Sequence, residues 1–244
     1  MKPLIIGHRG VCSEPENTLK AFKKAIELKV DMVELDVRLT KDKIPVVMHD
    51  ENVNRTTNGR GRVNELTLKE VKRLDAGDGE QVPTLQEVID LVKGKAKLVI
   101  EIKTYATIKP VARLIKKNQI INSTIVISFG HIISKMFKKM IPGVLTGVLL
   151  VSLPINPIKT AEDANADFLI SYYETILAGS PIYKRVLKQA KKKNIKVLAA
   201  EIHEKDSIAQ SQIKQLMKMG VDGFVLNRPN LALNIDNKKR FMFW

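Results

Sequence analysis

The chain has 244 residues, of which 44% are hydrophobic and only 5% aromatic, a composition that favours one globular domain and excludes disordered and fibrous classes. Its one cysteine, Cys12, allows no internal disulfide, and the first apolar run stops at Gly7, which is too early for a secretory signal. No apolar run approaches the roughly 20 residues that span a bilayer. We therefore expect a single cytoplasmic domain over residues 1–244 without a transmembrane segment. The composition does not indicate an oligomeric state.

The charge balance points to anionic partners. The chain carries 41 basic and 26 acidic residues, a net charge of +15 that attracts nucleic acid, anionic lipid and phosphorylated metabolites alike. Surfaces that read nucleic acid usually combine basic side chains with stacking aromatics, and this sequence has no such cluster. We expect no nucleic-acid partner, although a basic module that binds an anion or nucleic acid without catalysis is the non-enzymatic alternative.

Short apolar runs alternate with segments of helical periodicity along most of the chain. The predicted strands are residues 4–7, 32–37, 98–102, 124–129, 145–151, 168–172, 197–202 and 223–226. The predicted helices are residues 17–28, 85–92, 111–117, 132–140, 159–165, 183–193 and 208–219. The first helix has three candidate caps, namely a capping box of Ser13 with Glu16, Asn17, or Thr18. The tail shows no clear helical pattern.

Eight strand-helix units of this length predict a TIM (β/α)8 barrel, and continuous apolar strands are typical of a parallel sheet that is covered on its outside. A turn at Lys41, Asp42 and Lys43 folds residues 44–48 back as a hairpin arm, and a short helix over residues 68–74 follows. We therefore predict a barrel with a small hairpin and helix insertion, about residues 44–83, after the second strand. A doubly wound open sheet is the alternative, and the missing glycine fingerprint after the first strand disfavours it.

The second strand carries two acids that alternate with apolar residues, so Glu34 and Asp36 point to the same side. Two carboxylates buried side by side would cost several kcal/mol without a partner, and a hard divalent cation would supply one. The hairpin arm returns His49 close to Asp36. The alternative is an exposed strand edge whose acids face water.

Other polar residues stand at the ends of neighbouring predicted strands: His8 and Arg9 after the first, and Glu101 and Lys103 at the third. Each has a simpler explanation, because His8 could be a hydrogen-bonded rim histidine and Glu101 with Lys103 a local ion pair. In a TIM barrel, however, the C-terminal ends of the strands carry the chemistry, so these side chains meet in one mouth. We expect Glu34, Asp36 and Glu101 to share a cation.

The combination of an acidic cluster, two histidines and two positively charged side chains indicates hydrolysis of a phosphate ester. His8 and His49 supply general acid and base, and Arg9 and Lys103 supply charge for an anion. No serine, cysteine or aspartate stands out as a protein nucleophile. The attacking oxygen is therefore expected from a neighbouring hydroxyl of the substrate, which has a proximity advantage, or from water.

Several motifs resemble the glycerophosphodiester phosphodiesterase family in order and spacing. They are His8-Arg9-Gly10, Pro15-Glu16-Asn17-Thr18, Glu34-Leu35-Asp36, His49-Asp50, Arg55-Thr56-Thr57, Pro83-Thr84-Leu85, Glu101-Ile102-Lys103 and Gly220-Val221-Asp222-Gly223. The resemblance implies release of glycerol 3-phosphate and an alcohol from glycerophosphodiesters. It also implies that His8 and His49 are the acid and base, that Glu34, Asp36 and Glu101 hold Mg²⁺ or Ca²⁺, and that Arg9 and Lys103 contact the phosphate.

The last third departs from the family pattern. Ala200-Glu201-Ile202-His203 stands where a tryptophan is often found on the seventh strand, and Leu226-Asn227-Arg228-Pro229-Asn230 replaces the more usual threonine-aspartate-arginine-proline-aspartate. These positions are expected at the mouth, beside the alcohol part of the substrate. A phosphodiesterase specific for lysophospholipids is therefore the alternative enzyme, and it would need an apolar groove near the mouth.

Overall fold

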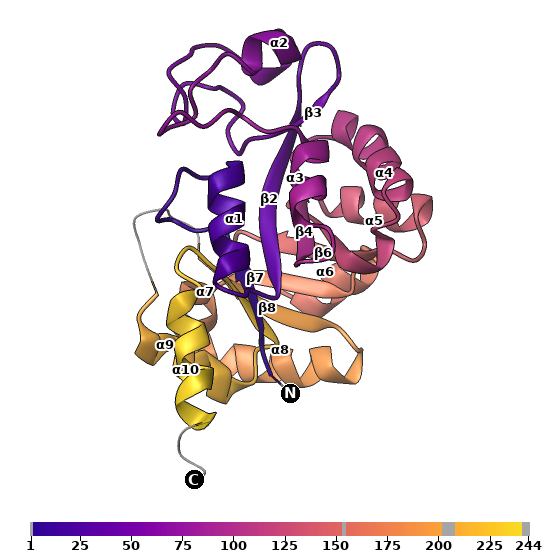
Figure 1. The fold of residues 1–244 in the computed structure, drawn as a ribbon. Coiled ribbons are helices and arrows are strands. Elements are labelled where there is room, and N and C mark those ends of the chain that lie inside the picture. Colours follow the sequence, from indigo (N-terminus) through magenta and orange to yellow (C-terminus); the bar gives the residue numbers. More distant parts are fainter. Residues whose placement is uncertain (1, 153–154, 202–207, 241–244) are drawn as a thin grey trace.

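Eight parallel strands form a closed barrel in the part of the chain described by this computed structural model, residues 2–152, 155–201 and 208–240. Closure follows because β1 (Leu4–Gly7) pairs with both β2 (Met32–Leu39) and β9 (Gly223–Leu226). The strands between them are β4 (Lys97–Ile102), β5 (Thr124–Ser128), β6 (Leu145–Leu150), β7 (Phe168–Tyr172) and β8 (Lys196–Ala200). The predicted TIM barrel is confirmed (Figure 1).

Helices cover the outside of the barrel. They are α1 (Leu19–Glu27), α3 (Leu85–Val92), α4 (Ile108–Lys117), α5 (His131–Met140), α6 (Pro157–Asp163), α7 (Tyr173–Ala178), α8 (Ser180–Lys192), α9 (Gln210–Met219) and α10 (Asn230–Arg240). Short 3-10 helices, η2 (Tyr105–Thr107) and η3 (Ile121–Ser123), precede α4 and β5. In the described part of the chain, no helix is both long and apolar enough to cross a membrane.

The buried core has an inner and an outer layer. Side chains such as Ile6, Val99 and Ile170 fill the barrel interior. A second layer lies between the strands and the surrounding helices, with Phe22 of α1 and Phe137 of α5 fully buried in it. A strand between these layers is covered on both faces, which explains the continuous apolar runs in the sequence.

The helix boundaries correct the sequence prediction in three places. Of the three candidate caps for the first helix, Thr18 is the residue whose hydroxyl accepts the Ala21 N–H, and α1 begins at Leu19. The six residues of α7 were not predicted, because so short a segment shows little periodicity. The tail forms α10, a polar helix whose pattern the sequence did not make clear.

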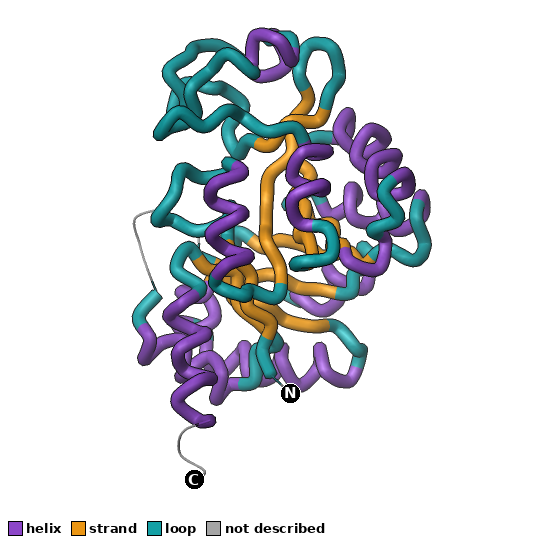
Figure 2. The backbone as a smooth tube through the Cα atoms, in the orientation of Figure 1, coloured by secondary structure: helices purple, strands orange, loops and turns teal. Residues whose placement is uncertain are grey.

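The predicted insertion after the second strand is present. Its arm, β3 (Pro45–Val47), pairs antiparallel with the outer end of β2, and η1 (Val63–Glu65) and α2 (Leu68–Val71) follow. The segment is mostly loop (Figure 2), extends beyond the barrel from the end of β2 (Figure 1), and has its own small apolar core. Pairing with β3 extends β2 to Leu39. Glu34 and Asp36 therefore lie within the strand and not at its predicted end.

Candidate active site

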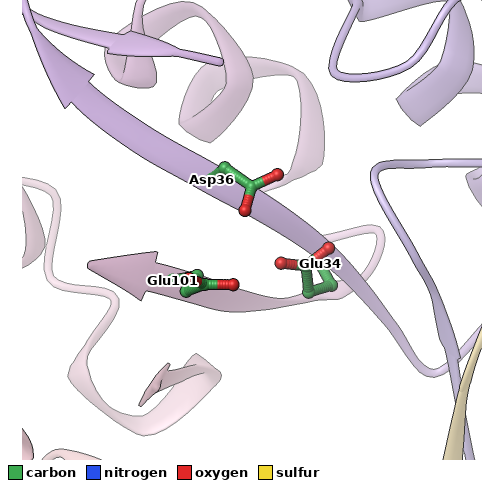
Figure 3. A group of neighbouring side chains, drawn as sticks. All are labelled: Glu34, Asp36 and Glu101. Atoms are coloured by element: carbon green, nitrogen blue, oxygen red, sulfur yellow. The ribbon is translucent and has the colours of Figure 1, made fainter. Parts of the chain in front are cut away.

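Three buried carboxylates from β2 and β4 meet at the mouth of the barrel. Glu34 and Asp36 share one face of β2, and the register places Asp36 directly beside Glu101 of β4. The three residues are 2%, 1% and 7% exposed, and one oxygen from each lies within 4.8 Å of the others. Figure 3 shows the carboxylates turned toward one another. The structure thus brings together the three residues predicted as cation ligands.

Two cationic side chains contact this carboxylate cluster. Lys103 Nζ lies 2.7 Å from Asp36 Oδ1 and donates to Glu101 Oε1 at 2.6 Å. The backbone N–H of Arg9 donates to Glu34 Oε2 at 3.0 Å, and Arg9 Nε lies 3.4 Å from Asp36 Oδ2. The clamp candidates therefore lie beside the proposed ligands, with Glu101 and Lys103 forming the ion pair that the sequence suggested.

The three carboxyl groups have different proton affinities. Burial, reinforced by Asp36 and Glu101, raises the pKa of Glu34 well above its usual range. Burial also raises the pKa of Glu101 to about 7, with Asp36 as the second cause. At Asp36 burial acts in the same direction, but Lys103 and Arg9 outweigh it and hold the pKa of this carboxyl below its usual range. Without a further cation, the site therefore favours a proton on Glu34.

The donor set fits a hard divalent cation. Carboxylate oxygens are the ligands that Mg²⁺ and Ca²⁺ prefer, and three of them converge here. When all three carboxylates are ionised, the two positive charges of Lys103 and Arg9 do not fully balance them, and the cluster has one excess negative charge. A divalent cation would reverse this to one excess positive charge, which matches the single negative charge of a phosphodiester.

His8 follows β1 and faces the same mouth. Its Nδ1 lies 2.7 Å from Asn227 Oδ1 at the end of β9, and its Nε2 lies 4.0 Å from Glu34 Oε2. An amide oxygen can only accept a hydrogen bond, so Nδ1 carries the proton and Nε2 keeps its lone pair. Burial, together with the charge of Arg9, lowers the pKa of His8 to about 4. The ring is therefore neutral and can act as a base.

His49 approaches from the hairpin arm. The N–H of Met48 donates to the Asp36 carbonyl, which aligns the arm with β2, and His49 Nδ1 lies 2.7 Å from Asp50 Oδ1. Burial lowers the pKa of His49, while Asp36 and Asp50 oppose this effect. A carboxylate partner favours the imidazolium form. His8 and His49 therefore differ in the group that orients each ring.

A carboxylate and guanidinium network links His49 to Arg9. Arg55 of the insertion donates two hydrogen bonds to Asp50 at 2.7 and 3.0 Å, and two more to Glu16 at 2.8 Å each. Glu16 in turn accepts a bond from Arg9 Nη1 at 3.0 Å. The hydrogen bonds to Arg55, followed by the one to His49, outweigh burial and lower the pKa of Asp50. In the sequence Arg55 was a motif residue, and Glu16 was a motif residue and a candidate helix cap, and this contact between them was not predicted.

The turn after β1 explains two other motif residues. Gly10 has a φ of 91°, and a Cβ there would lie 2.6 Å from the Cβ of Ala21, so a side chain would separate the turn from α1. Asn17, with a φ of 59°, donates to Asp36 Oδ2 at 2.9 Å. The sequence signal for both was their place in the resembling motifs, and the structure supplies the physical reason.

The pocket beside these residues, about 320 Å³, has two dissimilar walls. His8, Arg9, Glu34, His49 and Glu101 line one side. The other side is mainly apolar and comprises Ile127, Phe129, Leu149, Ile170, Tyr172, Ala200 and Val225. An apolar surface of the kind that the alternative lysophospholipid enzyme would need is therefore present near the mouth, on the strands that follow β4 in the barrel.

Glu201, at the point of departure from the family pattern, also lines this pocket and is buried. Its carboxylate accepts the backbone N–H groups of Asn227 and Ile208. Glu201 thereby anchors the segment that presents Asn227 to His8, a role that the sequence did not reveal. The neighbouring Ile202 and His203 lie outside the described residues.

Comparison with known proteins agrees with this geometry. Residues 8–231 match the Glycerophosphoryl diester phosphodiesterase family. The glycerophosphodiester phosphodiesterase of Caldanaerobacter subterraneus is 37% identical, over 98% of this chain and 99% of the relative, and that of Bacillus altitudinis is 30% identical, over 95% and 97%.

Solved structures give the same result. An Oleispira antarctica phosphodiesterase in complex with the product sn-glycerol-3-phosphate has a TM-score of 0.82 and 26% identity, over 95% of this chain and 97% of that chain. Glycerophosphodiester phosphodiesterase from Agrobacterium tumefaciens has a TM-score of 0.80 and 26% identity, over 94% and 98%. With the family match over nearly the whole length and the relatives above, the chain belongs to the glycerophosphoryl diester phosphodiesterase family of enzymes.

Proposed function

We propose that this enzyme hydrolyses glycerophosphodiesters to glycerol 3-phosphate and an alcohol, with Mg²⁺ or Ca²⁺ held by Glu34, Asp36 and Glu101. The observation that carries the proposal is the buried carboxylate cluster, with Arg9 and Lys103 in contact with it and a histidine on either side. When bound, the cation supplies positive charge for the phosphoryl oxygens and for the charge that develops on them. Family membership favours this enzyme over the alternative of a non-catalytic basic module.

Arg9 and Lys103 hold the phosphate in the proposed reaction. Both side chains already lie at the cluster through contacts to Asp36, so little movement is needed to place their charge on a phosphoryl oxygen. Arg9 offers a planar fork and Lys103 a single point of charge. The two side chains therefore orient the substrate in different ways.

The hydrogen-bond partners of the histidines support a different role for each. His8, with its proton held on Nδ1 by Asn227, removes the proton from the attacking hydroxyl through Nε2. His49, paired with the Asp50 carboxylate, gives a proton to the leaving alcohol oxygen as the bond from phosphorus to that oxygen breaks. The attacking hydroxyl belongs either to the substrate's own glycerol, giving a cyclic phosphate that water then opens, or to water.

We also propose that residues 1–244 act as one catalytic domain in the cytoplasm. Every proposed site residue lies on the barrel strands, on the loops that follow them, or on the arm of the insertion over residues 44–83. One barrel therefore supplies the whole site. Small glycerophosphodiesters are the expected partners, and nucleic acid is not.

A second candidate function is hydrolysis of lysophospholipids. The observation that favours it is the apolar wall of the pocket, which offers Phe129, Leu149 and Ile170 to a hydrocarbon group. Glycerophosphodiesters remain the first choice because the charged wall accounts for the phosphate chemistry without an acyl chain.

The test is a panel of glycerophosphodiesters with choline, ethanolamine and glycerol as alcohols, together with a lysophospholipid, each assayed for release of glycerol 3-phosphate or its acylated form. We expect turnover of the glycerophosphodiesters that chelation abolishes and Mg²⁺ or Ca²⁺ restores. Activity on the lysophospholipid alone would favour the second candidate. Full activity after chelation would refute the cation site, and no turnover of any member would refute the proposed function.

A further inference from the structure

Exposed apolar side chains gather at one sector of the barrel mouth. Nine large hydrophobic side chains are exposed among the described residues, and six of them follow three consecutive strands. They are Tyr105 after β4, Phe129, Ile132 and Met136 after β5, and Val151 and Ile155 after β6, here called the apolar rim. Four of the six are at least half exposed, namely Tyr105 at 58%, Ile132 at 50%, Val151 at 69% and Ile155, whose side chain is fully exposed.

Strand order makes the apolar rim continuous. β4, β5 and β6 are hydrogen-bonded neighbours in the barrel, and all six residues come after the C-terminal ends of these strands. Phe129 belongs both to the rim and to the apolar wall of the pocket. The rim is therefore an outward extension of that wall, and at its β4 end it adjoins the strand that carries Glu101.

The same segment of the chain is basic throughout. Residues 102–161 contain nine lysines and arginines and no aspartate or glutamate, although the whole chain has 26 acidic residues. Lys109, in the first turn of α4, and Lys135, in the second turn of α5, are exposed near the rim end of the barrel. Neither forms an ion pair with another described residue. Positive charge thus borders the apolar rim without nearby acids in the sequence to balance it.

We propose that the apolar rim and the adjoining lysines dock this enzyme on an anionic lipid bilayer. A bilayer interface takes up side chains such as phenylalanine, isoleucine and tyrosine among its acyl chains and attracts lysine to its headgroups. Nucleic acid would match the charge but gains little from aliphatic side chains, and an acidic protein would match it less well because the rim needs an apolar counterpart. The proposal goes beyond hydrolysis, since docking requires no turnover.

Docking in this orientation leaves the active site accessible to substrates. The rim follows β4, β5 and β6, whereas β8, β9 and β1 lie on the other side of the barrel. Soluble substrates can still enter from that side, while a substrate with a hydrocarbon group can reach the apolar wall from the lipid. The bilayer therefore contacts the wall that the phosphate chemistry does not use.

The experiment measures binding of the full chain to vesicles by co-sedimentation. Vesicles of phosphatidylcholine alone are compared with vesicles that also contain phosphatidylglycerol, at low and high salt. We expect binding to the anionic vesicles that is roughly tenfold weaker in the Ile132→Ser/Val151→Ser variant and in the Lys109→Glu/Lys135→Glu variant. High salt should weaken the binding of the wild type.

Two matched controls test whether the binding surface is located at the apolar rim. Leu145→Ser removes an exposed apolar side chain from the start of β6, at the opposite end of the barrel, and Lys188→Glu/Lys192→Glu reverses two exposed charges on α8. Both controls should bind like the wild type, and every variant should keep its thermal midpoint and its turnover of a soluble glycerophosphodiester.

A fluorescent probe tests insertion directly. In a Cys12→Ser background, an environment-sensitive dye on Val151→Cys should shift to shorter wavelength when anionic vesicles are added, and the same dye on Leu145→Cys should not. The proposal is wrong if the wild type fails to bind anionic vesicles at low salt, if the controls lose as much binding as the rim variants, or if the rim variants bind normally and change only the oligomeric state.

Discussion

The mouth of this barrel has two sectors of opposite character. The sector from β1, β2 and β4, together with the arm that follows β2, contributes every charged or titratable group that lines the pocket except Glu201 and Tyr172, whereas β5, β6 and β7 contribute mainly apolar side chains to the same pocket. One sector carries a network of buried charges whose proton affinities depend on one another, and the other imposes only shape and hydrophobicity. We infer from this difference that separate strands serve the phosphate chemistry and the recognition of the alcohol, so that each can be altered without the other.

The largest expected effect is on the histidines of the charged sector. His8→Ala and His49→Ala should each lower kcat by roughly 10²- to 10⁴-fold without unfolding the protein. An analogue with a p-nitrophenyl leaving group needs no acid, so it should restore turnover in the His49 variant and not in the His8 variant. The reverse pattern of rescue would exchange the two roles, and wild-type kcat in either variant would remove that histidine from the mechanism.

The network through Arg55 should matter less, because it positions His49 and Arg9 without touching the reacting atoms. Arg55→Met removes four hydrogen bonds from Asp50 and Glu16, and we expect kcat to fall about 10- to 100-fold. Arg55→Lys should recover little of this, since an ammonium cannot bind two carboxylates in fork geometry.

Arg62→Met is the matched control for Arg55. Arg62 is an exposed arginine in the same insertion, and its partner Glu51 lies 3.7 Å away at the surface. This variant should keep wild-type kcat. If added guanidinium partly restores the kcat of the Arg55→Met variant, the lost side chain acts through its hydrogen bonds. If kcat falls equally in both arginine variants, the effect comes only from the change in net charge.

The buried carboxylates should make the charged sector less stable when no cation is bound. Glu34 has a raised pKa in the folded state, so ionising it above its unfolded pKa costs folding free energy, and the cost grows as pH rises toward the folded pKa. Glu34→Gln should therefore raise the thermal midpoint of the chelated protein at pH 8, by about 2–4 °C for each kcal/mol, and raise it less at pH 5. Addition of Mg²⁺ or Ca²⁺ should stabilise the wild type more than the variant. A chelated variant that melts below the wild type at pH 8 would contradict this account.

The smallest expected effect is in the apolar sector. Phe129→Ala should leave kcat for glycerophosphocholine within about twofold and raise KM for substrates with apolar alcohols by several-fold, because only the lost burial of the alcohol changes. Steady-state kinetics on paired polar and apolar alcohols would measure this. A large fall in kcat for the polar substrate would show that the two sectors are not separable.

Local patterns in the sequence determined much of this protein. Alternation along residues 32–37 placed Glu34 and Asp36 on one face, and apolar runs located all eight barrel strands, because a strand covered on both faces must be apolar throughout. The charged residues within or after those runs, from His8 to Lys103, were informative because burying them needs a reason. Their assembly in one mouth then follows from the parallel direction of the strands.

Which of these groups touch depends on how the chain folds in three dimensions. Barrel closure brings Asn227 to His8 across 219 residues, the register of β2 and β4 sets Asp36 beside Glu101, and the folded insertion carries Arg55 to Glu16. Local periodicity predicts which face of a strand or helix a residue lies on, but not which distant residue it contacts. For the same reason the helix α10 and the anchoring role of Glu201 were not foreseen, since each depends on packing between elements far apart in the chain.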